Sequence, residues 1–209
     1  MTIIEDLKWR YATKKFDPTK TISDEDFETL KSAMQLTASS YGLQPYKILN
    51  IEDKALRTKL RAASWNQPQI EEASHMIVLA HMTDFGDELV DDYFKNVIET
   101  RNLNKEDVSD YANTVKSTIG QFSKEQKANW TAKQAYIVVG NLLAAAAQLK
   151  IDACPMEGFQ NEEYNKILDL NSKNLNAAVV VTLGYRSEAD ATQHHKKVRK
   201  SEQQLFINF

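Results

Sequence analysis

The sequence is short of the residues that cross-link or interrupt a chain. Its 209 residues include one cysteine, four prolines and six glycines. A single thiol, Cys154, cannot form a disulfide within the chain, which is typical of a protein kept in a reducing compartment. Few prolines and glycines predict mostly regular secondary structure. We find no internal repeat and no low-complexity linker, and the length suits one domain over residues 1–209.

Excess positive charge is also missing. The 26 Lys and Arg residues face 29 Asp and Glu residues, for a net charge of −3, which argues against a general nucleic-acid or membrane-surface binder. The longest apolar run, 135–149, contains Gly140 and Asn141 and is shorter than the ~20 residues that span a bilayer, so it predicts a buried helix. The acidic start "MTIIEDLKWR" is unlike a signal peptide, and we expect a cytoplasmic protein.

Several familiar motifs are absent from the sequence. Without HExxH or CxxC spacing, we expect no metal site. Without GxGxxG or GxxxxGK, neither a Rossmann fingerprint nor a P-loop is predicted, and without GxSxG serine hydrolysis lacks support. The function must therefore rest on residues outside these short motifs.

The hydrophobic pattern predicts helices separated by a few strands. We expect helices at 23–37, 53–63, 89–98, 105–120 and 124–149, and strands at 46–51, 75–82 and 176–185. Ser23, followed by three acidic residues, is a typical helix N-cap. Pro155 and Gly158 predict a shaped loop over 152–159. Separated strands among many helices indicate an α+β fold.

Two compact groups of positive charge lie near opposite ends of this acidic chain. "RYATKKFD" (10–17) contains Arg10, Lys14 and Lys15, and "KKVRK" (196–200) contains Lys197 and Arg199. Arg and Lys donate short, charge-assisted hydrogen bonds to phosphate oxygens. We therefore expect both groups to fold onto one small anionic ligand. The alternative is two solvated runs of surface charge.

Three other segments are suggestive. The small residues of "ASSYG" (38–42) would let a flat ring approach the backbone, or would simply end a helix. Cys154 is expected to be a packed thiol, and Glu157 a plain loop carboxylate rather than a catalytic acid. The apolar tail residues Leu205, Phe206, Ile207 and Phe209 should dock on a surface, preferably that of a second copy.

Together these segments resemble one family. "RYATKKFD", "ASSYGLQPY", "WNQPQIEEASHMIVL", "CPMEGF" and a closing K-x-R occur in the order found in the FMN-dependent nitroreductase family. The match is closest to its oxygen-insensitive NAD(P)H nitroreductase and dihydropteridine reductase branch, and it covers essentially the whole chain. The resemblance implies a nitroreductase-like α+β fold, with a small, mostly antiparallel sheet wrapped by helices. It also implies an intertwined homodimer with FMN at the interface, and a tail (about 190–209) that docks on the partner.

The resemblance also implies site residues. Arg10, Lys197 and Arg199 match the phosphate-binding positions, and Lys14 matches the lysine near flavin N1 and O2. Asn66 would contact the ring and ribityl chain, and the backbone N–H of Glu157 would face N5. The complete set of matching cofactor-binding positions is Arg10, Ala12, Lys14, Ala38, Ser39, Ser40, Asn66, Gln69, Pro155, Met156, Glu157, Gly158, Lys197 and Arg199. Of these, 38–40 would reach the FMN of the other subunit.

The chain departs from close relatives at two of these positions. Ala12 stands where a serine is common, which removes one phosphate contact, and Gln69 stands where a lysine is common, which leaves Lys14 with less help near N1. A lower flavin potential would follow. The substrate-gating region, 105–125, offers Tyr111, Val115 and Lys116, and the acceptor cannot be read from it.

The implied activity is that of an NAD(P)H-dependent oxidoreductase. FMN would pass hydride through N5 from NADH or NADPH to nitroaromatics, quinones or pterins by ping-pong exchange, and no protein nucleophile is required. A specialised member, such as a reductive dehalogenase or a flavin-consuming enzyme, is an alternative, although 209 residues leave little room for a lid. A non-catalytic flavin-binding or redox-sensing protein is another.

Overall fold

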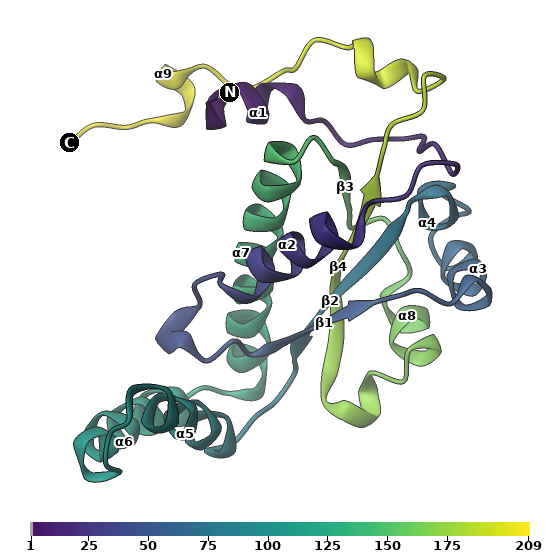
Figure 1. The fold of residues 1–209 in the computed structure, drawn as a ribbon. Coiled ribbons are helices and arrows are strands. Elements are labelled where there is room, and N and C mark those ends of the chain that lie inside the picture. The colour runs from purple at the N-terminus through teal and green to yellow at the C-terminus, as the bar shows by residue number, and fades with distance from the viewer. Residues whose placement is uncertain (1) are drawn as a thin grey trace.

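The chain folds as an antiparallel sheet between two layers of helices (Figure 1). The computed structural model describes residues 2–209. Its strands are β1 (Tyr46–Asn50), β2 (His75–Met82), β3 (Asp152–Met156) and β4 (Leu175–Gly184), in the order β1-β2-β4-β3. All three pairings are antiparallel. The predicted α+β class, with a small antiparallel sheet wrapped by helices, is confirmed.

The predicted helices form close to their expected bounds. The helices are α1 (Ile3–Trp9), α2 (Asp24–Gln35), α3 (Lys54–Ala62), α4 (Gln69–Glu72), α5 (Glu88–Arg101), α6 (Glu106–Gly120), α7 (Lys124–Gln148), α8 (Asn161–Ile167) and α9 (Glu202–Leu205). Ser23, Asp53 and Ser123 cap α2, α3 and α7, because each side chain accepts a backbone N–H of the first turn. The long helix α7 follows its capping box without a break.

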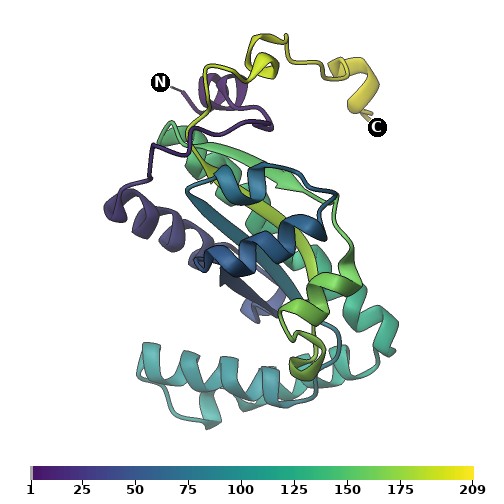
Figure 2. The ribbon, with the colours of Figure 1, turned by 90° about the vertical axis from the view of Figure 1, so that its right-hand side faces the viewer.

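Alternation along the central strand β2 builds a core on each face of the sheet. Met76, Val78 and Ala80 point toward α3, α4 and α8, whereas Ile77 and Leu79 point toward α2 and α7. Figure 2 shows α3, α4 and α8 in front of the sheet. Both clusters consist of almost fully buried side chains, so the sheet is a rigid support for the loops at its ends.

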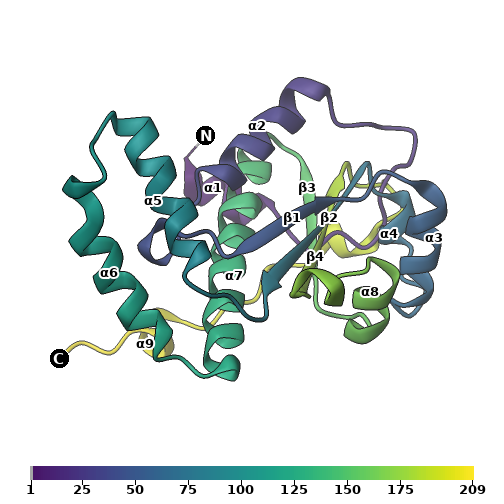
Figure 3. The ribbon, with the colours of Figure 1, turned by 90° about the horizontal axis from the view of Figure 1, so that it is seen from below.

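Helices α5 and α6 form a pair that projects from one end of the sheet (Figure 3). Phe85, Val90, Phe94, Val115 and Ile119 make a separate small core for this pair. The end that carries α5 and α6 lies opposite the end where α1 and the C-terminal segment meet (Figure 1).

The predicted burial of 135–149 is wrong for one face of α7. Tyr136 and Ile137 are 42% and 47% exposed, and Gly140 and Asn141 are exposed beside them. The opposite face, with Val138 and Leu142, is buried against the sheet. The second half of the helix is apolar on most sides, but in one chain only the inner face has a partner. Within residues 2–209, no helix is long and apolar enough to cross a membrane.

The predicted loop at 152–159 is wrong for its first five residues, which form β3. Pro155 does not prevent the strand, because β3 lies at the edge of the sheet, where a missing N–H costs no ladder bond. A buried strand of only five residues without polar alternation gave no periodic signal. Residues 157–159 do form the turn between β3 and α8.

Candidate functional site

The segment that follows α1 and the segment that follows β4 lie side by side at the upper end of the sheet (Figure 1). The N-terminal loop after α1 pairs with β3 through Ala12 and Ala153, and with the segment after β4 through Phe16 and Arg186. Backbone hydrogen bonds extend this contact: Asp17 N donates to Tyr185 O at 2.8 Å, and Ser187 N donates to Lys15 O at 3.0 Å. Residues 10–17 are therefore held between β3 and the C-terminal segment.

This arrangement brings the two cationic groups together. Lys197 Nζ donates to Leu7 O at 2.9 Å and to Arg10 O, at the carboxyl end of α1. Burial lowers the pKa of Arg10, and the positive charge of Arg199 lowers it further. The pKa of Lys197 is likewise lowered by burial, then by Arg10 and Arg199. Arg10, Lys197 and Arg199 thus lie close enough to repel one another.

The cationic group has no carboxylate in ion-pair contact among the described residues. Within residues 2–209, no carboxylate forms a salt bridge with Arg10, Lys197 or Arg199. The Nε of Arg10 is buried without a hydrogen-bond partner in the described chain. Buried donors are normally satisfied, and mutual repulsion is normally offset. A phosphate group would do both, so these residues fit the anionic end of a ligand.

Lys14 and Gln69 lie next to this group, beside β3. Burial raises the pKa of the Cys154 thiol, and the positive charges of Lys14 and Arg10 oppose this rise. Gln69, 3% exposed, lies near enough to the Cys154 thiol to lower its pKa, and its Oε1 finds no partner within the described residues. The thiol is packed, as predicted. The unpaired Gln69 oxygen adds a second buried polar atom that a ligand could satisfy.

A strained turn lies against the loop after β3. Trp65 and Asn66 both adopt the left-handed conformation, with φ of 51° and 57°. Gln67 Nε2 donates to Gly158 O at 2.8 Å, and a Cβ at Gly158 would come within 3.0 Å of the Trp65 ring. Strained non-glycine residues are often retained at binding sites. The predicted site positions Asn66 and Gly158 are therefore held next to each other.

The loop after β3 is also tied to α7. Tyr136 donates its hydroxyl proton to Glu157 Oε1 at 2.6 Å. Burial and then this bond raise the pKa of Tyr136 to about 12, so the phenol remains protonated and donates. Pro155 and Met156, the last two residues of β3, directly precede Glu157. The carboxylate of Glu157 thus helps to fix the loop. The group that the resemblance assigns to the ligand is a different one, the backbone N–H of the same residue.

Residues 38–40 lie apart from the other predicted positions in this one chain. Ser40 N donates to Gln134 Oε1 on α7 at 2.8 Å, and Ser39 Oγ accepts from Gln44 N at 3.0 Å. The next residue, Tyr41, has φ of 55° within the 3₁₀ helix Ser40–Gly42. The resemblance assigns Ala38, Ser39 and Ser40 to the FMN of a partner subunit, and that assignment stays a prediction.

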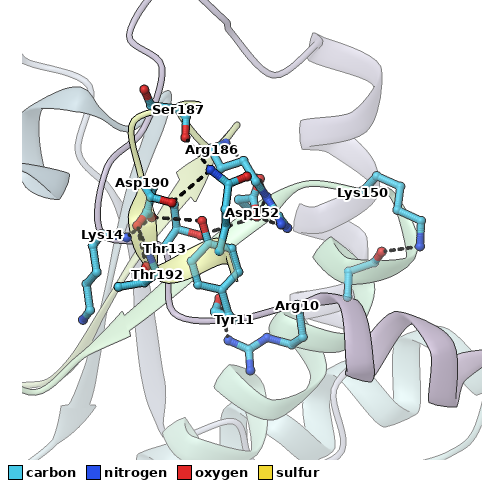
Figure 4. Close-up of polar contacts among 12 residues, drawn as sticks. Arg10, Tyr11, Thr13, Lys14, Lys150, Asp152, Arg186, Ser187, Asp190 and Thr192 are labelled. Carbon is cyan, nitrogen blue, oxygen red and sulfur yellow. Dashed lines mark hydrogen bonds and ion pairs between the residues drawn. The ribbon is translucent and has the colours of Figure 1, made fainter. Parts of the chain in front are cut away.

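Asp190, Asp152 and Arg186 hold the site together and escaped sequence reasoning (Figure 4). Asp190 is 1% exposed and accepts hydrogen bonds from Lys14 N at 2.8 Å and Tyr11 Oη at 2.9 Å. The Asp152 carboxylate accepts hydrogen bonds from the backbone N–H of Arg186 at 2.8 Å and from Arg186 Nε. The Arg186 guanidinium lies 4.3 Å from the Trp9 ring centroid and 4.7 Å from that of Tyr11. The partners of Asp190 are about 175 residues away in sequence, so no local pattern could reveal them.

His75 and His81 belong to the structural framework. His81 Nδ1 contacts Thr131 Oγ1 at 2.9 Å, and its Nε2 contacts Asn176 Nδ2 at 3.0 Å. Burial lowers the pKa of His81, so the ring is neutral. His75 stacks on Phe27 at 3.9 Å. Among residues 2–209, no three His, Cys, Asp or Glu side chains gather to hold a metal ion.

The three residues offered for substrate gating differ in access. Val115 is buried, and Lys116 pairs with Asp91 at 2.6 Å, whereas Tyr111 is exposed on α6 with an edge against Phe94. Of the three, Tyr111 is the side chain with a large free surface.

Comparison with known proteins gives consistent matches. Residues 7–185 match the model of the Nitroreductase family. A protein of Staphylococcus epidermidis named "Putative NAD(P)H nitroreductase" is 34% identical, and the match covers 98% of this chain and 95% of that protein.

Solved structures share the fold. The Bacillus subtilis protein ydfN, described as a nitroreductase, superposes with a TM-score of 0.88 at 18% identity over 99% of this chain and 98% of that chain. An Exiguobacterium sibiricum protein described as a "putative nitroreductase in complex with FMN" superposes with a TM-score of 0.85 at 18% identity over 100% of this chain and 98% of that chain. The predicted nitroreductase-like fold is confirmed.

Proposed function

Because the chain belongs to the Nitroreductase family, we propose that it is an FMN-dependent NAD(P)H oxidoreductase that reduces nitroaromatics, quinones or related electron-poor acceptors. One observation carries the proposal: Arg10, Lys197 and Arg199, from opposite ends of the chain, gather without a carboxylate partner among residues 2–209. Clustered cations with an unpaired buried Nε are what a phosphate monoester needs.

The chain's own residues have distinct tasks in this proposal. Arg10, Lys197 and Arg199 bind the FMN phosphate, and Asn66 and the Glu157–Gly158 loop hold the ring. Lys14 supplies positive charge near N1 and O2, and Gln69, which is neutral, supplies none. FMN, when bound, supplies hydride transfer through N5 between NAD(P)H and the acceptor, and the two substrates take turns at one site. The backbone N–H of Glu157 would face N5 of the bound ring, and Tyr136 holds its loop.

Positive charge near N1 favours the reduced flavin, because its negative charge develops on that edge. Gln69 in place of a second lysine leaves this task to Lys14 alone among the matched positions. We therefore expect a flavin potential lower than that of relatives with both lysines. Ala12 similarly leaves the phosphate to the cations, without a hydroxyl at that position.

The proposed active unit is a homodimer of one domain, 1–209, in the cytoplasm. The exposed apolar face of α7 and the exposed tail residues Leu205, Phe206 and Ile207 support a partner surface. A groove of about 780 Å³ between α2 and β1 has the apolar residues Phe27, Met34 and Ile48 among a largely polar lining, and it offers the tail of a second copy a place to dock. Within residues 2–209, β1 pairs with β2 alone, so its outer edge is available to such a tail.

Anaerobic bleaching tests the proposal. The purified protein is reconstituted with FMN, freed of excess flavin, and titrated with NADH and with NADPH while the yellow absorbance is followed. We expect at least one donor to bleach the flavin, and a nitroaromatic or quinone to restore the colour. A yellow protein that neither donor bleaches would indicate a non-catalytic flavin-binding protein. A chain that does not take up FMN would contradict the proposed cofactor.

A further inference from the structure

Asp190 is the buried carboxylate that joins the two cationic segments (Figure 4). Its Oδ2 accepts from Lys14 N at 2.8 Å, Lys15 N at 3.2 Å and Tyr11 Oη at 2.9 Å. Its Oδ1 accepts from Thr192 N at 3.0 Å and from the Thr192 hydroxyl. Both oxygens are thus saturated, and the side chain is 1% exposed. The carboxylate contacts the N-terminal loop on one side and its own segment on the other.

The donors are neutral groups. Within residues 2–209, no Lys or Arg side chain forms a salt bridge with Asp190. Lys14 and Lys15 donate through the backbone, so their ammonium groups are not neutralised by this acid. In Figure 4 the Lys14 side chain extends away from Asp190. Asp190 therefore fixes where Lys14 lies without reducing the charge that Lys14 offers.

The same residue anchors the segment that carries the other cations. Asp190 N donates to Ser187 O at 3.0 Å, and the Asp190 carbonyl accepts from Gln193 Nε2 at 2.9 Å. Asp190 caps the 3₁₀ helix Ala191–His194, which directs the chain toward Lys197 and Arg199. Asp190, through its side chain and its backbone, thus sets the positions of cations that come from both ends of the molecule.

We propose that Asp190 is a positioning residue for FMN, which aligns the N-terminal loop with the 190–199 segment so that Arg10, Lys197 and Arg199 converge on the phosphate. The proposal rests on the proposed function. Asp190 touches no ligand itself. Loss of its carboxylate should loosen the alignment of the two segments. The contribution of the phosphate to the FMN affinity should then fall more than the contribution of the ring.

The test compares FMN with riboflavin, which has the same ring but no phosphate. Affinities of both flavins are measured by fluorescence quenching for the wild type, Asp190→Asn and the control Asp17→Asn. Asp17 is a carboxylate of the same loop whose side chain accepts from Thr19 N at 3.0 Å. Only its backbone N–H, which the substitution keeps, contacts the C-terminal segment. Asn at 190 keeps the shape but cannot accept hydrogen bonds on both sides.

We expect Asp190→Asn to weaken FMN binding at least about tenfold and riboflavin binding less than about threefold. The substitution removes hydrogen bonds to a charged acceptor, and these bonds align the segments that carry the phosphate-binding cations. The control should leave both affinities unchanged. If Asp190→Asn does not fold, Tyr11→Phe removes one donor and should lower the FMN-to-riboflavin ratio in the same direction by about two- to threefold.

Equal losses for the two flavins, or no loss for either, would overturn the positioning role while leaving the proposed function intact. A wild type that binds neither flavin would overturn both. The ratio of the two affinities separates positioning from a general loss of stability, because unfolding reduces the binding of both ligands by the same factor.

Discussion

At the scale of the residue, Lys14 is the charge on which the proposed chemistry depends most. Lys14→Ala removes the cation assigned to N1 and O2, and neutral Gln69 cannot replace it. We expect NAD(P)H to bleach bound FMN about ten- to a hundredfold more slowly, because a fixed charge near a developing charge acts on the barrier. Stopped-flow absorbance measures this rate. Lys15→Ala, which alters the neighbouring lysine, is the control, and equal effects of the two substitutions would contradict the assignment.

Asp190 also predicts how stability depends on pH. Burial opposes its ionisation, but hydrogen bonds from Thr192 and from the Lys14 and Lys15 backbone outweigh burial and lower its pKa to about 2, from 3.8. A depressed folded pKa contributes stability above the unfolded value and loses it as pH falls through the folded one. We expect Asp190→Asn to cost roughly 2 kcal/mol at pH 6 and much less near pH 2. Urea unfolding at both pH values checks this. A cost that does not change with pH would rule out the mechanism.

The sequence revealed these residues unevenly. Arg10, Lys14, Lys197 and Arg199 stand out because charge is visible in a sequence, and the structure brings the two groups together. Asp190 is one of 29 acidic residues, and nothing in its neighbourhood distinguishes a buried acceptor from a solvated one. Its role comes from donors that the fold delivers from the other end of the chain.

At the scale of the element, the sequence predicted the periodic segments and missed short ones. Helices such as α2 and α7 combine a cap with a long apolar stripe, and β2 spans the predicted 75–82. The strand β3 has only five residues, one of them a proline, so it forms because it pairs with β4 and not because of local propensity. The consequence for the site is direct, because β3 carries the Glu157 loop.

The link between α7 and that loop is testable. Tyr136→Phe keeps the ring but removes the hydroxyl that donates to Glu157 at 2.6 Å. We expect amide exchange at Gly158 and Phe159 to rise by about three- to tenfold with little change in global stability, since one hydrogen bond is lost at one loop. Hydrogen exchange by mass spectrometry measures this. Tyr111→Phe on α6 is the control, and equal protection at this loop in the two variants would refute the link.

At the scale of the whole molecule, the nitroreductase-like α+β fold could be predicted because five segments follow the family order along the chain. The assembly could not be predicted from the residue pattern, because the apolar pattern of α7 indicates a buried helix but does not show which surface covers its outer face. The exposed face with Tyr136 and Ile137 and the apolar tail are two surfaces that one chain leaves uncovered.

The homodimer is tested through the tail. Phe206 and Ile207 are 66% and 78% exposed in the single chain, and each would gain about 1.5–3 kcal/mol if buried on a partner. We expect the double substitution Phe206→Ala and Ile207→Ala to raise the dissociation constant at least about a hundredfold. Sedimentation velocity over a concentration series measures it. Gln203→Ala with Gln204→Ala is the control. A wild type that stays monomeric throughout would disprove the dimer.

The most direct measurement is the affinity of FMN and riboflavin for four proteins: the wild type, Arg10→Ala, Arg199→Ala and the double variant. If two distant segments bind one phosphate, each single change weakens FMN at least about tenfold, riboflavin binding hardly changes, and the two effects are not additive, because both residues contact one group. Equal affinity of the wild type for FMN and riboflavin, or equal losses for both flavins in the variants, would contradict the claim that the two ends of this chain meet on the phosphate.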